Sequence, residues 1–195
     1  KNGRPSIGSG LVFPLGEEKI LVEPIKLESH WPRIAAIDFG WDHPTAVVWC
    51  AIDRDEETFY IYDCYRASKA SPTVHAGAIK GRPHFIPIAY PHDGNRRDSM
   101  GNPGLADQYR NLGCNFLLEH FTNPPALGNN KGSNSIEEGL MAMLQAVEGG
   151  KFKVFSNLSD WFEEFRMYHR KDNKVVPLRD DLMSATRYAF QSQRF

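Results

Sequence analysis

A run of apolar residues that ends in an aspartate constrains this chain more than any other stretch. Ile34-Ala35-Ala36-Ile37 leads directly into Asp38, with Pro32 before it and Gly40 and Pro44 after it. A continuous apolar run between turn residues predicts a strand buried on both faces, as in a mixed or parallel central sheet. A carboxylate at the end of such a strand needs a cation, a hydrogen-bond donor or water. Asp38 is therefore either a metal ligand or a loop aspartate that caps a turn.

The composition limits the size of the fold and the kind of partner it can have. The chain has 195 residues, of which 41% are hydrophobic, so we expect one domain, or one domain with an arm. Its net charge of -1 excludes a broadly basic surface, and any nucleic-acid contact must come from local basic clusters. We see no apolar stretch long enough to span a bilayer and no secretory signal, so we expect no membrane association. Because the chain begins at Lys1, we also expect it to be a fragment of a longer protein.

The patterns along the chain predict three antiparallel strands and then alternating helices and strands. The first strands cover about 33–38, 46–52 and 58–66, and alternation places Asp63 toward solvent. Further strands are expected at 85–90, 115–119 and 152–155, and helices at 71–80, 105–112, 135–148, from a cap at Asn157 or Ser159 to 168, and 180–191. Residues 169–178 read as a basic loop. This order predicts an α/β fold with a central mixed sheet and helices on both faces.

Three acidic sites lie at the ends of elements that this fold would bring together. Asp38 ends the first strand, Asp93 follows the fourth strand, and Asp180-Asp181 opens the last helix. If the first and fourth strands are adjacent and parallel, Asp38 and Asp93 share the sheet edge where open α/β sheets place their sites. Clustered carboxylates repel one another unless cations bridge them, and oxygen ligands suit Mg²⁺ or Mn²⁺. Two such ions about 3.5–4 Å apart can clamp both oxygens of a phosphodiester.

Each acid also has a structural explanation when it is taken alone. Asp93 precedes a glycine and is typical of a turn. Asp180 is placed to cap the last helix, and Asp181 to complement its dipole. His43 and His92 are interpreted as orienting or surface residues and not as ligands. The joint placement of all three acidic sites favours a metal centre over these separate roles.

The sequence resembles the C-terminal nuclease domain of tailed-phage terminase large subunits, which has an RNase H-like fold. Ile37–Thr45 and Asp180–Tyr188 carry the resemblance, and Gly8–Pro14 resembles the segment that joins this nuclease to its packaging ATPase. The resemblance implies a Mg²⁺- or Mn²⁺-dependent endonuclease with two ions. That family cuts concatemeric double-stranded viral DNA at the start and end of head filling.

The resemblance also assigns site residues. Asp38, Asp93 and either Asp180 or Asp181 would be the catalytic metal ligands. A common version of the last motif has His where Asp181 stands and a further Asp at Ser184, while other branches have the Asp-Asp-Leu seen here. Which of Asp180 and Asp181 binds metal is therefore left open.

Domains and partners follow from the same resemblance. Residues 1–30 would be a linker or docked arm from a preceding ATPase domain, and 31–195 the nuclease domain. A GxxxxGK[ST] phosphate loop does not occur in the sequence. The implied partners are double-stranded DNA, the ATPase domain, the small terminase subunit and the portal, in the host cell cytoplasm.

Local basic residues near the acids are the candidates for DNA contact. Two follow Asp93, one lies in the polar loop at 121–133, and the others precede the last helix. The set is Arg96, Arg97, Lys131, Arg170, Lys171 and Arg179.

Three other interpretations remain open from the sequence. Another RNase H-like enzyme, such as a transposase, integrase or junction resolvase, would share the acids but would not be expected to show these terminal segments. A sugar-kinase or actin-like ATPase has a similar Asp38-Phe39-Gly40 loop, but it needs a second glycine-rich loop and a longer chain. A non-catalytic module that docks on DNA or the portal would keep the acids without cutting DNA.

Overall fold

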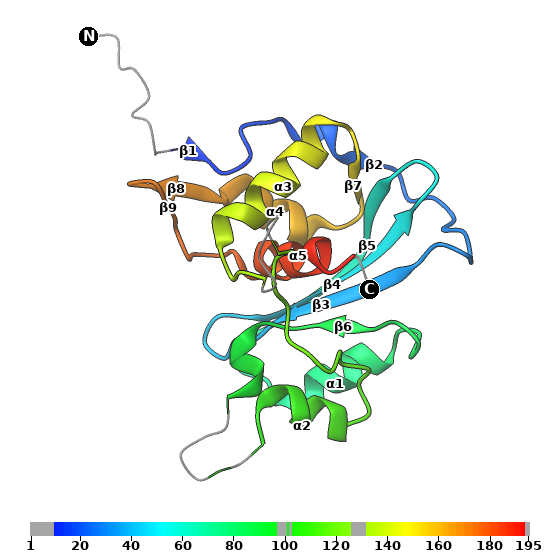
Figure 1. Ribbon diagram of the computed structural model, residues 1–195, viewed down its shortest axis with the longest axis vertical. Coiled ribbons are helices and arrows are strands. Elements are labelled where there is room, and N and C mark those ends of the chain that lie inside the picture. Colours follow the sequence, from blue (N-terminus) through cyan, green and yellow to red (C-terminus); the bar gives the residue numbers. More distant parts are fainter. Residues whose placement is uncertain (1–9, 97–100, 102, 126–131, 194–195) are drawn as a thin grey trace.

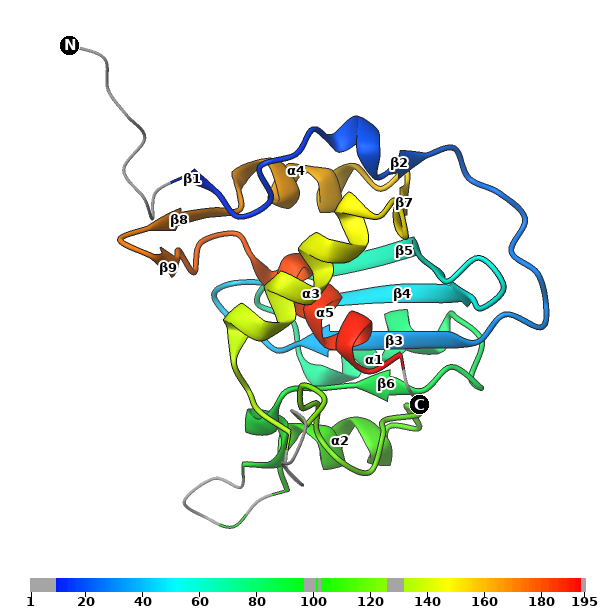
Figure 2. The ribbon, with the colours of Figure 1, turned by 45° about the horizontal axis from the view of Figure 1, so that its top comes forward.

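The computed structural model describes residues 10–96, 101, 103–125 and 132–193. Its centre is a six-stranded sheet in the order β2-β7-β5-β4-β3-β6 (Figures 1 and 2). β3 (Arg33–Asp38), β4 (Thr45–Asp53) and β5 (Thr58–Ala67) are antiparallel. β6 (Ile88–Ala89) pairs in parallel with β3, and β7 (Phe152–Phe155) pairs in parallel with β5. The predicted mixed sheet is confirmed, and so is the parallel pairing of the strands that precede Asp38 and Asp93.

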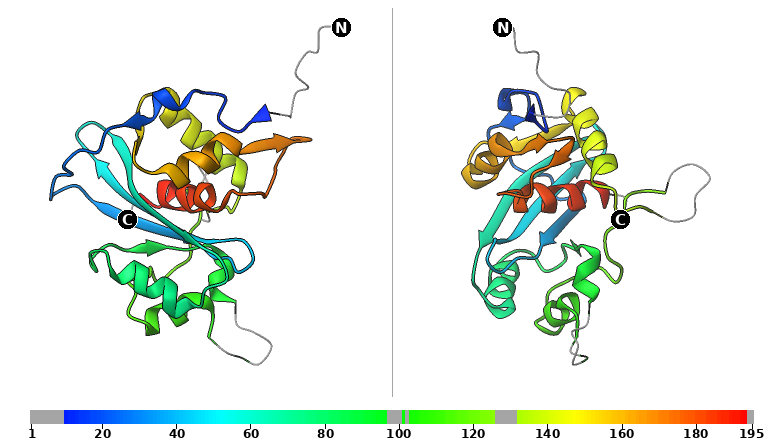
Figure 3. Two further views of the ribbon diagram at one scale, coloured as in Figure 1. Left: turned by 180° about the vertical axis from the view of Figure 1, so that it is seen from behind. Right: turned by 90° about the vertical axis from the view of Figure 1, so that its left-hand side faces the viewer.

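Helices cover both faces of this sheet (Figures 1 and 3). On one side lie α1 (Pro72–Lys80) and α2 (Leu105–Asn111), and on the other α3 (Ile136–Glu148), α4 (Ser159–Met167) and α5 (Asp181–Gln191). Successive side chains of β3 point to opposite faces of the sheet, because side chains alternate along a strand. Ile34 and Ala36 belong to the core under α3, α4 and α5, whereas Ala35 and Ile37 belong to the core above α1 and α2. Asp38 continues the first series and therefore faces α5.

The segment before β3 is docked on the domain as an arm. β1 (Gly10–Leu11) pairs with β8 (His169–Lys171), and β2 (Leu21–Val22) pairs in parallel with β7, beyond the short 3-10 helix η1 (Glu17–Lys19). Between these strands Val12, Phe13 and Ile20 are buried, and the Phe13 ring stacks on Phe165 with centroids 5.7 Å apart. Part of the segment at 11–30, which was expected to be a small hairpin or a docked arm, thus contributes to the core.

The stretch 169–178 is not the basic loop that was predicted. It contains a hairpin of β8 and β9 (Lys174–Val175), which turns at Asp172 and Asn173 with φ of 51° and 63°. Asp and Asn tolerate this left-handed conformation better than most residues. The pairing of β8 with β1, far away in the sequence, completes a three-stranded sheet that a local pattern does not reveal.

One predicted strand is shorter than expected, and another does not form. The strand at 85–90 is reduced to β6, because Pro87 has no N–H to donate and contributes only its carbonyl, which accepts from the Ala35 amide at 2.9 Å. The strand at 115–119 is wrong: a single bridge joins Ile88 to Phe116, and Leu118 is 89% exposed.

Two smaller predictions differ from the structure. Asp63 is not simply solvent-facing, because it forms an ion pair with Arg82 at 2.9 Å and is half-buried. α4 begins after Leu158, which makes no side-chain cap, so neither Asn157 nor Ser159 caps it.

Within the described ranges, no helix combines the length and the apolar character needed to cross a membrane.

Candidate active site

The turn from β3 to β4 brings a histidine next to Asp38. Thr45 closes this turn, since its Oγ1 accepts from the Gly40 amide at 3.1 Å and donates to the Gly40 carbonyl at 2.9 Å. A Cβ on Gly40 would overlap the carbonyl oxygen and the imidazole of His43. Glycine therefore permits the tight turn that places His43 beside the end of β3.

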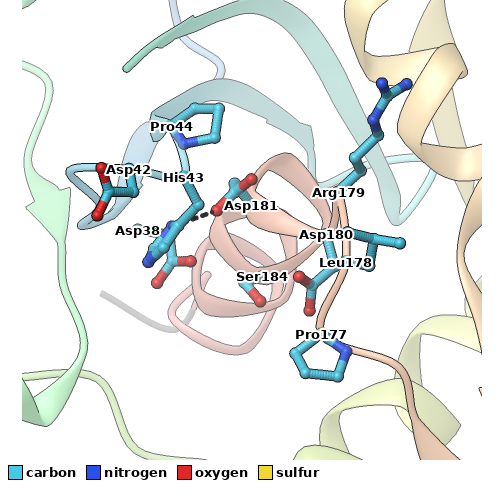
Figure 4. Close-up of a pocket in the computed structure, with 10 residues that line it drawn as sticks. All are labelled: Asp38, Asp42, His43, Pro44, Pro177, Leu178, Arg179, Asp180, Asp181 and Ser184. Carbon is cyan, nitrogen blue, oxygen red and sulfur yellow. Dashed lines mark hydrogen bonds and ion pairs between the residues drawn. The ribbon is translucent and has the colours of Figure 1, made fainter. Parts of the chain in front are cut away.

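The start of α5 supplies two further carboxylates to the same place. Asp180 is the N-cap residue of α5, and Asp181 is its first helical residue and only 5% exposed. Asp181 Oδ1 lies 2.7 Å from Nδ1 of His43 (Figure 4). Two turns along α5, the Tyr188 hydroxyl donates to Asp38 Oδ1 at 3.3 Å. α5 thus contacts both Asp38 and the turn that follows it.

These side chains line an open cleft of about 660 Å³ at the end of β3 (Figure 4). The cleft is lined by Asp38, Asp42, His43, Pro44, Pro177, Leu178, Arg179, Asp180, Asp181 and Ser184. Asp93 lies on the 3-10 helix η2 (His92–Asn95) and lines a second cavity of about 340 Å³. His43 belongs to the walls of both cavities. Three of the four predicted acids therefore share one cleft, and Asp93 borders its neighbour.

The clustered acids change one another's protonation. Burial, reinforced by the charges of Asp181, Asp180 and Asp93, raises the pKa of Asp38 from 3.8 to about 7. Burial and the Asp181 charge also raise the pKa of Asp180. Partial burial lowers the pKa of His43, but the hydrogen bond and charge of Asp181 outweigh it, so the net pKa is raised. The cleft concentrates negative charge that a cation would neutralise.

The donor set fits a hard divalent cation better than a soft one. The converging groups are carboxylates, which suit Mg²⁺ and Mn²⁺, and no cysteine lines the cleft among the described residues. As the side chains stand, no three of the acidic, histidine and cysteine groups in the described ranges form a ready cluster for a metal ion. A bound cation would remove the repulsion among the carboxylates of the cleft.

Of the predicted DNA-contacting residues that the structure describes, only Arg179 lines the cleft. Arg170 pairs with Glu137 at 2.6 Å, and Arg179 pairs with Glu163 at 3.1 Å and extends away from the carboxylates (Figure 4). Arg96 and Lys171 are exposed. Arg97 and Lys131 lie outside the described residues.

Sequence reasoning missed two residues that contact the site elements. Tyr188 lies seven residues after Asp181, a spacing that returns to the same helix face, and could have been found from it. Glu164 is 0% exposed, and its carboxylate accepts from the Leu182 amide at 2.7 Å and from Arg66 at 3.0 Å. Burial raises the pKa of Glu164 to about 7, although the hydrogen bonds from Leu182 and Arg66 lower it. Its signal in the sequence is an acid on the apolar face of α4, which also carries Trp161 and Phe165.

Known proteins match this chain over nearly its whole length. A family model described as the terminase RNaseH-like domain matches residues 35–193. The large terminase subunit of Salmonella phage P22 is 38% identical over 194 residues, which cover 99% of this chain and 38% of that protein. The chain therefore spans well under half the length of this curated relative.

Solved structures agree with the sequence match. The structure of the P22 large terminase nuclease domain has a TM-score of 0.85 and 37% identity, covering 96% of this chain and 94% of that one. The nuclease domain of the large terminase from bacteriophage SPP1, solved with bound Mn, has a TM-score of 0.59 at 18% identity. That match covers 87% of this chain and 93% of the SPP1 chain, and it extends the likeness of fold to a distant sequence. The mixed sheet with helices on both faces is an RNase H-like nuclease fold.

Proposed function

Because this chain belongs to the terminase RNase H-like domain family, we propose that it is a divalent-metal-dependent endonuclease that cuts double-stranded viral DNA during genome packaging. The observation that carries the proposal is the meeting of Asp38, from the end of β3, with Asp180 and Asp181, from the start of α5, in one cleft. Asp93 lies beside this cleft and is close enough to raise the pKa of Asp38. The fold and its relatives support the class of enzyme, and the meeting of the acids supports this cleft as the place of the chemistry.

We assign the metal-holding role to Asp38, to Asp93 and to one or both of Asp180 and Asp181. Two Mg²⁺ or Mn²⁺ ions held there would activate water and stabilise the attacking and leaving oxygens of a phosphodiester. The SPP1 nuclease domain, which shares this fold, was solved with bound Mn.

Other residues of the chain orient these ligands. The Tyr188 hydroxyl fixes one oxygen of Asp38 and leaves the other free to face the cleft. The His43 imidazole fixes one oxygen of Asp181, and a protonated imidazole would reduce the repulsion between Asp181 and Asp38. His43 therefore acts as an orienting residue in this proposal.

The wider setting is part of the same proposal. Residues 1–30 would connect to an ATPase domain, with the arm from 10 to 30 docked on the nuclease domain at 31–195 as described above. Double-stranded DNA would be the substrate, and the small terminase subunit and the portal would be partners of the complete protein in the host cell cytoplasm. The chain spans 38% of its P22 relative. The roles of the rest of the complete protein are therefore proposed from its family.

The test is nicking of supercoiled plasmid by the purified chain with Mg²⁺ or Mn²⁺. We expect cleavage that EDTA stops and that Asp38→Asn abolishes, while Asp55→Asn, at the exposed turn between β4 and β5, keeps wild-type activity. A long linear substrate should give a smear, since clamping phosphates reads no base edges. Full activity of Asp38→Asn with Mg²⁺ would reject the metal mechanism. A folded wild-type chain that never nicks DNA would favour the non-catalytic docking module.

A further inference from the structure

Glu164 is a buried carboxylate that links three elements without lining the cleft. It lies on α4 and is 0% exposed. One carboxylate oxygen, Oε1, accepts from Arg66 Nη1 on β5 at 3.0 Å. The other, Oε2, accepts from the backbone amide of Leu182 on α5 at 2.7 Å. Burying an acid is costly unless its oxygens are satisfied, so this arrangement needs both partners.

The contact with Leu182 replaces a cap that α5 lacks. The first amides of a helix have no partner within the helix, and a side-chain oxygen of the N-cap residue normally accepts from one of them. Asp180, the N-cap residue of α5, makes no such side-chain bond. Glu164 supplies the acceptor from a different helix, and its carboxylate, when ionised, suits the positive end of the helix dipole. The carboxylates of Asp180 and Asp181 are thereby left to the cleft.

The contact with Arg66 connects Glu164 to the central sheet, at the strand position that lies level with Asp38. Asp38 on β3 pairs with Ala46 on β4, and Ala46 pairs with Arg66 on β5. Directly paired residues of antiparallel strands project to the same face, so Asp38 and Arg66 both face α5. Arg66 also pairs with Asp160 and Glu163, which are more exposed than Glu164. Glu164 therefore connects Arg66, which lies in the same row of the sheet as Asp38, to Leu182, which follows Asp181 on α5.

We propose that Glu164 is a positioning residue that sets the separation between Asp38 and the Asp180–Asp181 pair, and so the affinity of the cleft for divalent ions. The inference rests on the proposed function. Ligands must be held close to their productive geometry, and losing an outer partner of a metal ligand typically weakens metal affinity by about 10–100-fold. Glu164 acts through the backbone of α5 and not by touching metal or DNA.

The experiment measures Mn²⁺ binding to the DNA-free chain by electron paramagnetic resonance, with urea unfolding to confirm that each variant is folded. Glu164→Met fills the same volume without an acceptor, and we expect Mn²⁺ affinity to fall by about 10-fold or more. Glu164→Gln keeps an oxygen for the Leu182 amide and should bind Mn²⁺ within about threefold of wild type. Glu163→Gln removes the same charge from the neighbouring, exposed partner of Arg66 and should leave Mn²⁺ affinity unchanged.

Each other outcome is decisive. Wild-type Mn²⁺ affinity in folded Glu164→Met would overturn the positioning role, as would an equal loss in Glu163→Gln, which would indicate a general charge effect. If neither Glu164 variant folds, the residue serves the stability of the whole domain and the positioning role is rejected. A wild-type chain that binds no Mn²⁺ would instead remove the proposed function on which this inference rests.

Discussion

At the scale of single residues, Asp38 occupies a position where no ordinary structural role explains a carboxylate. It ends a strand whose other side chains are buried and apolar, and it faces α5 beside two more acids. Its visible hydrogen-bond donor is the Tyr188 hydroxyl at 3.3 Å, a neutral group. The energetic cost of ionising Asp38 agrees with the cation-binding role proposed for this cleft.

This cost predicts how the metal-free protein responds to pH. Because the pKa of Asp38 rises from 3.8 to about 7 on folding, the folded state keeps a proton on Asp38 where the unfolded state has lost it. Stability therefore falls as pH rises between these two values and is level above them. The Asp38→Asn variant should not lose stability in this way, because asparagine does not ionise. Its free energy of unfolding should match wild type below pH 4 and exceed it by on the order of a few kcal/mol at pH 8.

Urea unfolding in EDTA at the two pH values measures this difference, and the comparison below pH 4 is the internal control. An advantage of Asp38→Asn that is the same at both pH values would contradict the prediction. Added Mn²⁺ should then raise the stability of wild type more than that of Asp38→Asn, since the ion binds the folded site.

Residue patterns reveal an acid's position along its own element but not its partners on other elements. The apolar run before Asp38 and the helix after Asp181 were sufficient to place these acids at element ends. The contact of Glu164 with Arg66 spans 98 positions in the chain, and no local spacing encodes it. The pairing of Arg170 and Arg179 with acids was missed for the same reason, and their contact with DNA stays a prediction.

At the scale of elements, α5 is the structural centre of the site, and its neighbour α3 holds it in place. Gly139 of α3 lies against Arg187 of α5, which is 5% exposed and stacks over the Phe121 and Tyr188 rings. A Cβ on Gly139 would come within 2.7 Å of Arg187 Cδ and 2.8 Å of its Cγ. The missing side chain allows α3 and α5 to approach closely.

Two glycines inside helices should therefore respond oppositely to alanine. Replacing a helical glycine normally gains up to about 1 kcal/mol from helix propensity. Gly77 of α1 has open space around it, so Gly77→Ala should be stabilising. Gly139→Ala should be destabilising by about 1–3 kcal/mol, because Arg187 is packed and overpacking forces it from its position. Urea unfolding of both variants tests this, and a stabilised Gly139→Ala would mean that α3 and α5 are not in contact as described.

Element prediction succeeded where the pattern is local and failed where pairing is distant. The apolar runs of β3, β4 and β5 and the stripe of α3 were recognised because each is continuous in sequence. The region at 115–119 was predicted as a strand, but it forms a single β-bridge, between Phe116 and Ile88. Its neighbour β6 has only two residues with which it could pair. The β8–β9 hairpin was missed, and its third strand, β1, lies more than 150 positions earlier in the chain.

At the scale of the whole molecule, charge limits how the chain holds its substrate. The net charge is -1, and Arg66, Arg166, Arg170 and Arg179 are each paired with acids. Non-specific affinity for DNA scales with the number of phosphates that lysine and arginine neutralise. Among the described residues, the one Lys or Arg that lines the cleft, Arg179, is paired with Glu163. Under the proposed function, tethering to an ATPase domain that holds DNA would raise the local DNA concentration.

We therefore expect weak binding of double-stranded DNA by the isolated chain, with a dissociation constant on the order of 10⁻⁴–10⁻⁶ M at physiological salt. The logarithm of affinity should fall only gently with the logarithm of salt, because few counterions are released. Fluorescence anisotropy at two salt concentrations, in Ca²⁺ or EDTA to prevent cutting, provides the measurement. Nanomolar binding by these 195 residues would show a DNA surface larger than the described residues provide.

The most direct test of the central claim is anomalous diffraction from crystals of this chain soaked in Mn²⁺. We expect Mn²⁺ in the cleft, bound by Asp38 and by Asp180 or Asp181, with Asp93 turned toward it, and loss of that density in Asp38→Asn. A cleft without Mn²⁺ at saturating concentration, or density that is unchanged in Asp38→Asn, would contradict it.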